Sequence, residues 1–175
     1  MTATTVTRFD RVTRVVHWST AVFGLILVVT GTILYVPDLS AVIGMRATLK
    51  EVHVIAGLLT VVPLAIAAAS GQPGRRLRAD LAELSRIGVS NGKFNGGQKF
   101  LTAVFSGLFT MQLLTGLIMF RPNAFADAWR TGATFVHDWA FVGLFLATVG
   151  HIVKAINEPE LLRSMMTGEG PERRD

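Results

Sequence analysis

The residues of this sequence best suited to hold a metal ion are its four histidines, His17, His53, His137 and His151. Histidine is the commonest metal ligand among the side chains. The chain contains no cysteine, which excludes disulfides, thiolate zinc sites, iron–sulfur clusters and covalently attached c-type haem. Any redox centre in this protein is therefore expected to be held by histidine, methionine or carboxylate.

Two of these histidines, His137 and His151, lie fourteen residues apart in the apolar run 134–156. Along a helix, fourteen residues correspond to a rise of about 21 Å and a rotation roughly 40° short of four full turns. Both imidazoles are therefore expected on nearly the same face of one helix, at two different depths. An ionisable side chain inside a membrane span is by default a functional candidate with a partner to be found.

The composition predicts that the elements carrying these histidines are membrane-spanning. Half of the 175 residues are apolar and only 17% are charged, whereas about a quarter of the residues in a soluble domain are charged. The length predicts a single domain, 1–175. The net charge of +5 would suit nucleic acid, but the basic residues flank apolar runs, so we expect membrane lipid and no nucleic acid as a partner.

Four apolar runs are long enough to cross a bilayer. The first follows a basic segment, as in a signal peptide, but it is too long for one and no A-x-A-like cleavage site follows it. Between the second and third runs lies a polar segment in which we expect a short amphipathic helix around residues 77–87. The sequence thus predicts an all-α membrane protein, a four-helix bundle whose spans cover about 15–36, 52–70, 100–120 and 134–156.

The distribution of lysine and arginine predicts the orientation of this bundle. With four spans, both termini and the long 71–99 loop lie on one side, and these segments carry thirteen basic residues. The two loops on the other side carry four, namely Arg46, Lys50, Arg121 and Arg130. The positive-inside rule therefore predicts cytoplasmic termini.

This orientation sorts the histidines into two levels. His17 and His151 fall near the cytoplasmic ends of the first and fourth spans, and His53 and His137 near the outer ends of the second and fourth. Two histidines at each of two levels indicate two haems b, each with its iron held by a histidine pair. Such ligation saturates the iron and suits electron transfer. The other interpretation is that the histidines are interfacial or bonded to carbonyls, in a membrane anchor without redox function.

Several segments also carry a family resemblance. They are similar to the cytochrome b (gamma) subunit of respiratory formate dehydrogenases, within the wider group of diheme cytochromes b561 and hydrogenase cytochromes b. The histidine pattern is shared across the wider group, and the Lys93–Lys99 passage is the more discriminating part. The segments are Arg14–Trp18, Glu51–His53, His137 with His151, Lys93–Lys99 and Asn157–Gly168.

The resemblance implies a diheme subunit of the bacterial inner membrane that passes electrons from an iron–sulfur subunit to menaquinone or ubiquinone. A molybdenum or tungsten subunit of the same complex would oxidise the substrate. By the family pattern, His53 and His137 hold the outer haem, and His17 and His151 the inner one. Quinone would bind beside the inner haem, at Asn95, Gly97 and Gln98.

Two alternatives stay open at this stage. The Asn95–Gln98 passage also fits a turn that merely caps the third span. The chain also fits a stand-alone protein of the cytochrome b561 or hydrogenase type that reduces quinone without a formate dehydrogenase. No P-loop, GxSxG, HExxH or paired-carboxylate motif indicates a hydrolytic or phosphoryl-transfer site.

Overall fold

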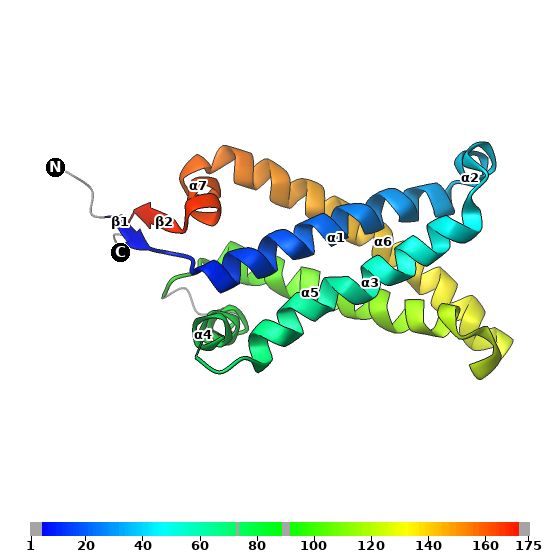
Figure 1. Cartoon of the computed structure of the whole chain (residues 1–175), viewed down its shortest axis with the longest axis horizontal. Coiled ribbons are helices and arrows are strands. Elements are labelled where there is room, and N and C mark those ends of the chain that lie inside the picture. Colours follow the sequence, from blue (N-terminus) through cyan, green and yellow to red (C-terminus); the bar gives the residue numbers. More distant parts are fainter. Residues whose placement is uncertain (1–4, 73, 89–91, 172–175) are drawn as a thin grey trace.

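Four long helices dominate the structure, a computed structural model that describes residues 5–72, 74–88 and 92–171 (Figure 1). Each is long and apolar enough to cross a membrane. The expected all-α bundle of four membrane helices is thereby confirmed. These helices are α1 (Arg11–Tyr35), α3 (Arg46–Ala69), α5 (Gly96–Phe120) and α6 (Asp127–Asn157).

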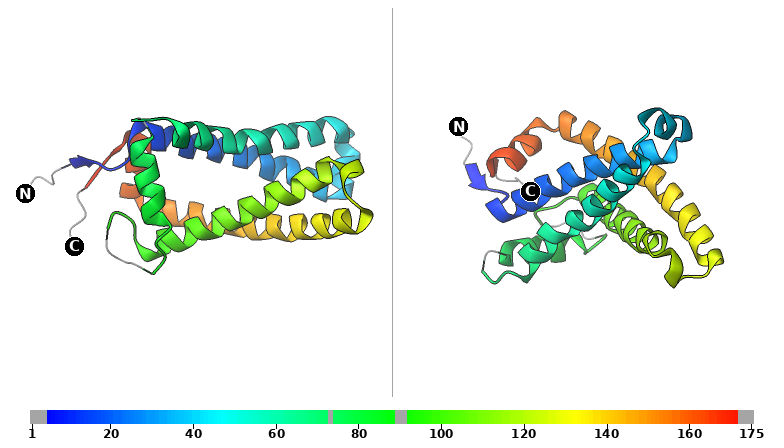
Figure 2. Two further views of the ribbon diagram at one scale, coloured as in Figure 1. Left: turned by 90° about the horizontal axis from the view of Figure 1, so that it is seen from below. Right: turned by 45° about the vertical axis from the view of Figure 1, so that its right-hand side comes forward.

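The long helices form two hairpins. Helix α1 packs along α3, and α5 packs along α6, whereas α1 meets α6 and α3 meets α5 at only a few positions. Figure 2 shows the hairpins as two layers whose helices cross. A side chain that bridges the layers therefore lies between two units that otherwise contact each other little.

The outer surfaces of the four helices are apolar. Large side chains such as Leu25, Leu58 and Phe135 are each more than 60% exposed. Several buried positions between helices are instead small or weakly polar, for example Ala56 and Ala140. This inverted distribution suits helices whose outer faces contact lipid, because small residues let neighbouring backbones approach closely.

The helices extend beyond the apolar runs at their polar ends. Helix α3 begins at Arg46 and α6 at Asp127, several residues before the apolar runs that they contain. Charged side chains are good enough helix formers to continue a helix into the interface. The amphipathic helix expected around 77–87 is present as α4 (Arg75–Leu84).

One end of the bundle, which we call the terminal end, carries α4, α7 (Pro159–Thr167) and two short strands (Figure 1). Strand β1 (Thr5–Thr7) pairs antiparallel with β2 (Glu169–Pro171). Arg14 Nη1 donates to Met166 O at 2.7 Å, and Trp18 Nε1 donates to Met165 O at 3.2 Å. The C-terminal segment is thus fastened to the first turns of α1.

Gly168 makes this fastening possible. Its φ of +92° is a left-handed conformation that favours glycine. Its carbonyl accepts hydrogen bonds from the backbone N–H groups of Arg8 and Phe9, at 2.9 and 3.2 Å. A Cβ atom at residue 168 would lie 2.9 Å from Phe9 O, so a larger residue would push the two segments apart.

The opposite end, which we call the α2 end, carries the short helix α2 (Pro37–Ile43) and the 3₁₀ helix η1 (Pro122–Ala124). Arg46 Nη1 donates to Leu34 O at 3.1 Å and to Ser40 Oγ at 2.9 Å. One guanidinium group thereby joins the end of α1, helix α2 and the start of α3. The first hairpin is closed by polar contacts where its apolar surface ends.

Candidate functional site

The two histidines nearest the α2 end come from different hairpins and face each other. His53 lies in the second turn of α3, and His137 lies in α6. Their ring centroids are 6.3 Å apart, with an angle of 63° between the ring planes. Both side chains are half-buried.

The other two histidines form a second facing pair near the terminal end. His17 of α1 and His151 of α6 have ring centroids 6.1 Å apart, with an interplanar angle of 59°. Trp18 lies edge-on to the His17 ring at 5.4 Å, and Phe105 of α5 lies edge-on to the His151 ring at 5.9 Å. Helix α6 therefore contributes one histidine to each pair.

Both separations fit a metal ion between two imidazoles. With a metal–nitrogen bond of about 2.0 Å and about 1.1 Å from nitrogen to ring centre, two imidazoles on opposite sides of one ion have centres about 6.2 Å apart. The observed values of 6.1 and 6.3 Å bracket this estimate. Within the described part of the chain, histidines and carboxylates form no cluster of three or more that could hold a metal ion. The donor set is thus two separate histidine pairs, and each pair would suit the iron of one haem b.

The pair at the α2 end has hydroxyl partners that the sequence did not reveal. Thr30 Oγ1 of α1 lies 2.8 Å from His53 Nδ1, and Thr115 Oγ1 of α5 lies 2.9 Å from His137 Nδ1. Each threonine is followed by a glycine, and each Thr-Gly precedes its histidine by just over twenty residues. This repeated spacing between a Thr-Gly pair and a histidine is the feature of the sequence that could have indicated the hydroxyl partners. Threonine is so common in membrane helices that it does not stand out alone.

The three residues expected at the quinone site lie together at the start of α5, at the terminal end. Asn95 Oδ1 accepts a hydrogen bond from the backbone N–H of Gln98 at 2.8 Å. Gln98 Oε1 accepts one from the backbone N–H of Asn95 at 3.0 Å. This reciprocal pair is a capping box, so the expectation of a turn that caps the third span is confirmed. Gly97 is exposed.

The passage that leads into this cap is fixed to its surroundings. Lys93 Nζ pairs with Asp80 Oδ2 of α4 at 2.6 Å and lies 4.8 Å from the centre of the Phe9 ring. The backbone N–H of Phe94 donates to Glu83 Oε1 at 3.0 Å. The start of α5 is therefore held against both α4 and the N-terminal segment, at the same end as the His17–His151 pair.

Comparison with known protein families identifies a match over most of the chain. The model of the family described as prokaryotic cytochrome b561 matches residues 8–168, which include all four histidines and the capping box. No curated protein matches the chain at a significant level. The match confirms the wider cytochrome b561 group named from the sequence, whereas the narrower resemblance to formate dehydrogenase subunits stays a prediction.

The family and the four apolar helices agree on an integral membrane protein of electron transfer. Haem b is the cofactor that the family implies, and the facing histidines supply a donor set that fits it. The chain belongs to the prokaryotic cytochrome b561 family.

Proposed function

We propose that this chain conducts electrons across the bacterial inner membrane through two haems b, from an iron–sulfur partner to a quinone. The observation that carries the proposal is the presence of two facing histidine pairs, each bridging the two hairpins at a separation that suits one iron ion. His53 and His137 would hold one haem, and His17 and His151 the other. Each haem, when bound, would accept and release one electron without exchanging a ligand.

The chain's own contribution is to fix the two sites at different depths. His137 and His151 stand on one helix, fourteen residues apart, which corresponds to a rise of about 21 Å. The pairs lie towards opposite ends of the bundle, so electrons that pass between them cross much of the membrane. The apolar outer faces of the helices would lie against lipid.

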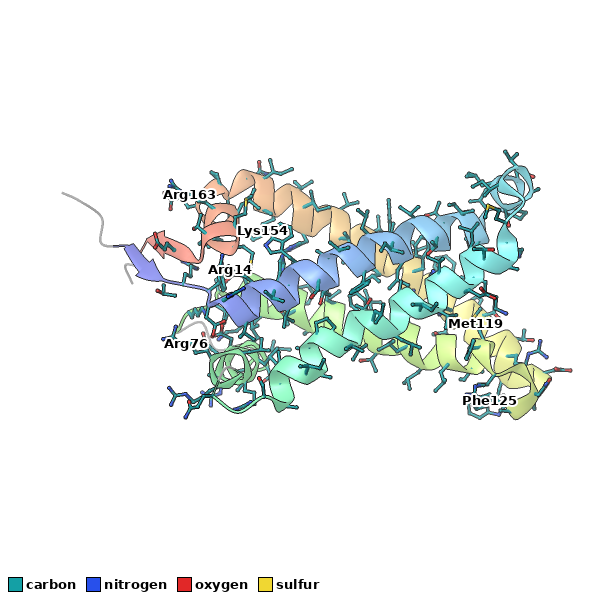
Figure 3. All side chains as sticks on the ribbon, in the orientation of Figure 1. Arg14, Arg76, Met119, Phe125, Lys154 and Arg163 are labelled. Atoms are coloured by element: carbon teal, nitrogen blue, oxygen red, sulfur yellow. The ribbon has the colours of Figure 1, made fainter. Side chains whose placement is uncertain are left out.

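The orientation of this path follows from charge. Figure 3 shows Arg14, Arg76, Lys154 and Arg163 at the terminal end, and Met119 and Phe125 towards the α2 end. The excess of basic residues favours the terminal end on the cytoplasmic side. The His17–His151 pair would then be the inner site, and the His53–His137 pair the outer one.

The quinone role of Asn95, Gly97 and Gln98 rests on the family resemblance, and the structure supplies two supporting facts. These residues form the N-cap and first turn of helix α5, at the same end as the His17–His151 pair, and Phe105 of α5 contacts His151. The capping box uses the side-chain oxygens of Asn95 and Gln98. The amide N–H₂ groups are donors and suit a quinone, whose oxygens accept. Two electrons from the haems and two protons from the cytoplasm would convert quinone to quinol.

The electron donor is proposed from the same resemblance. An iron–sulfur subunit, itself supplied by a molybdenum- or tungsten-containing formate dehydrogenase subunit, would dock near the outer pair. The alternative of a stand-alone quinone reductase predicts no such partner. Purification of the intact complex in mild detergent distinguishes the two, because only the first yields stoichiometric iron–sulfur and molybdenum or tungsten subunits.

Haem content tests the proposal itself. Purified protein should show a b-type alpha band and release about two haems per chain into acidified organic solvent. A value near one or zero would overturn the two-site proposal. For the quinone step, Gly97→Val and Asn95→Ala should slow quinol formation while the donor still reduces both haems. Unchanged quinol formation in both variants would move the quinone site elsewhere.

A further inference from the structure

We propose that Thr30 and Thr115 are positioning residues, which fix the ring proton of His53 and His137 on Nδ1 and so direct Nε2 of both rings to the iron. Their hydrogen bonds also lower the reduction potential of the haem that these two histidines would hold. The inference rests on the proposed ligation of a haem by these two histidines. It adds a reason for the two haems of one small chain to differ in potential.

The hydrogen bonds of Thr30 determine which partner donates. A threonine hydroxyl has a single hydrogen. Thr30 Oγ1 lies 2.7 Å from Ile26 O, a carbonyl that can only accept, and 2.8 Å from His53 Nδ1. If the hydroxyl donated to Nδ1, two oxygen atoms would face each other at 2.7 Å with no hydrogen between them. Both contacts are favourable only when the hydroxyl donates to Ile26 and Nδ1–H of His53 donates to the hydroxyl.

The second hairpin repeats this arrangement. Thr115 Oγ1 lies 2.6 Å from Met111 O and 2.9 Å from His137 Nδ1. Because the single hydroxyl hydrogen of Thr115 goes to Met111 O, Nδ1 of His137 must carry a hydrogen. Thr30 and Thr115 are buried, at 6% and 8% exposure, so water does not offer either hydroxyl an easy substitute for these bonds. In both rings the unprotonated nitrogen is Nε2, the atom that binds a metal.

The glycine after each threonine leaves room for the histidine ring. A Cβ atom at Gly31 would lie 3.4 Å from His53 Cε1, and one at Gly116 would lie 3.5 Å from His137 Cε1. These are ordinary contact distances, so a Cβ fits, and a bulky side chain directed at the ring would displace it. Each Thr-Gly pair therefore supplies a hydrogen-bond acceptor and a space for the ring beside it.

The pair at the terminal end lacks this support. In the described ranges of the chain, no hydrogen bond reaches a ring nitrogen of His17 or His151, whose neighbours are the aromatic rings of Trp18 and Phe105. A hydrogen bond donated from Nδ1 makes an imidazole a more basic ligand, which stabilises the ferric state. The haem between His53 and His137 should therefore have the lower potential of the two, which favours electron flow from that haem to the one at the terminal end.

The test is a redox titration of the full chain with its haems bound. Thr30→Val and Thr115→Val remove the acceptor but keep the side-chain shape, and Thr30→Ser and Thr115→Ser keep the hydroxyl. The matched controls are Thr32→Val on α1 and Thr110→Val on α5. These two threonines donate to a carbonyl four residues earlier, at 2.8 Å, and within the described residues they form no hydrogen bond with a histidine. The haem at the α2 end is identified by its loss in His53→Ala.

Each valine variant should raise the potential of the haem at the α2 end by roughly 59 mV, which corresponds to a tenfold change in its ferric-to-ferrous ratio. The other haem should not shift, the serine variants should stay close to wild type, and the largest EPR g value of the affected haem should move. If a valine variant loses that haem altogether, retention of the haem by the serine variant still supports the inference.

An unchanged reduction potential of the α2-end haem in both valine variants would overturn the inference. Equal shifts in Thr32→Val and Thr110→Val would also overturn it. Serine variants that behave like the valine variants would also overturn it, because they retain the acceptor. The proposed function fails by a different result, namely that His53→Ala keeps both haems.

Discussion

The two histidine pairs are alike in separation but held in different ways. At the α2 end, Nδ1 of each histidine lies within hydrogen-bond distance of a threonine hydroxyl on the other helix of its own hairpin. At the terminal end, the rings rest against Trp18 and Phe105. The first site is thus built from contacts within each hairpin, and the second from packing that also involves the chain termini. Similar distances between the ligands therefore do not imply similar control of the ligands.

The two histidine pairs also differ in which helix of each hairpin carries the histidines. The α2-end pair uses the second helix of each hairpin, and each Thr-Gly stands on the first helix. The terminal-end pair uses the first helix of one hairpin and the second helix of the other. The hairpins therefore repeat one another at one level only. The site without the repeat is the one beside the proposed quinone loop, where the protein adds α4, α7 and the strand pair.

The largest effect should come from filling the space beside a ring at the α2 end. We expect Gly116→Leu to displace the His137 ring and lower haem occupancy at this site about tenfold, with the other site unaffected. Gly107→Leu is the matched control on the same helix, because a Cβ atom there has no neighbour within 4 Å. Haem content and the alpha-band spectrum measure both. Equal losses of haem in the two variants would mean that α5 tolerates no large side chain at either position. The result would then not support a role of Gly116 at the α2-end site.

A smaller effect is expected from the aromatic contact at the terminal end. Phe105→Leu removes the edge-on contact with His151, and an aromatic pair of this kind contributes about 1 kcal/mol. Haem affinity at the terminal end should fall about fivefold, while the potential of the haem at the α2 end stays the same. Phe109→Leu is the control, since the Phe109 ring pairs with that of Phe105 and, among the described residues, with no histidine ring. A change confined to the α2-end haem would contradict the proposed separation of the two sites.

The smallest effect concerns the fastening of the C-terminal segment. Trp18→Phe keeps an aromatic ring beside His17 but removes the hydrogen bond to Met165 O, which contributes about 1 kcal/mol. The C-terminal segment should become more sensitive to limited proteolysis, with little change at the α2 end. Trp139→Phe serves as the control, because Trp139 is 64% exposed. Equal proteolysis of both variants would show that the hydrogen bond does not hold the segment.

The sequence predicted the four membrane helices because a run of about twenty apolar residues has few other stable solutions. It also placed the histidines at two depths, since depth follows directly from position along a span. The helix ends were less predictable: Arg46–Lys50 and Asp127–Ala133 are helical although they lie outside the apolar runs. Polar residues at an interface fit a helix and a loop about equally well, so composition does not separate the two.

The rest of the site depended on tertiary contacts. Thr30 and Thr115 gain their role only because the rotation of each hairpin brings them opposite a histidine, which no pattern within a single helix reveals. The pairing of β1 with β2 joins two three-residue strands from opposite ends of the chain. Strands this short leave no periodicity to detect. Asn95 and Gln98 illustrate a middle case, in which the local motif predicted the cap but not whether the same residues also bind quinone.

The most direct test of the two-pair account is the haem content of double histidine variants. His53→Ala combined with His137→Ala should leave one haem per chain, and so should His17→Ala combined with His151→Ala, because each pair shares one iron. His17→Ala combined with His53→Ala should leave none. One haem remaining in that last variant, or none in either of the first two, would contradict the pairing of His53 with His137 and of His17 with His151.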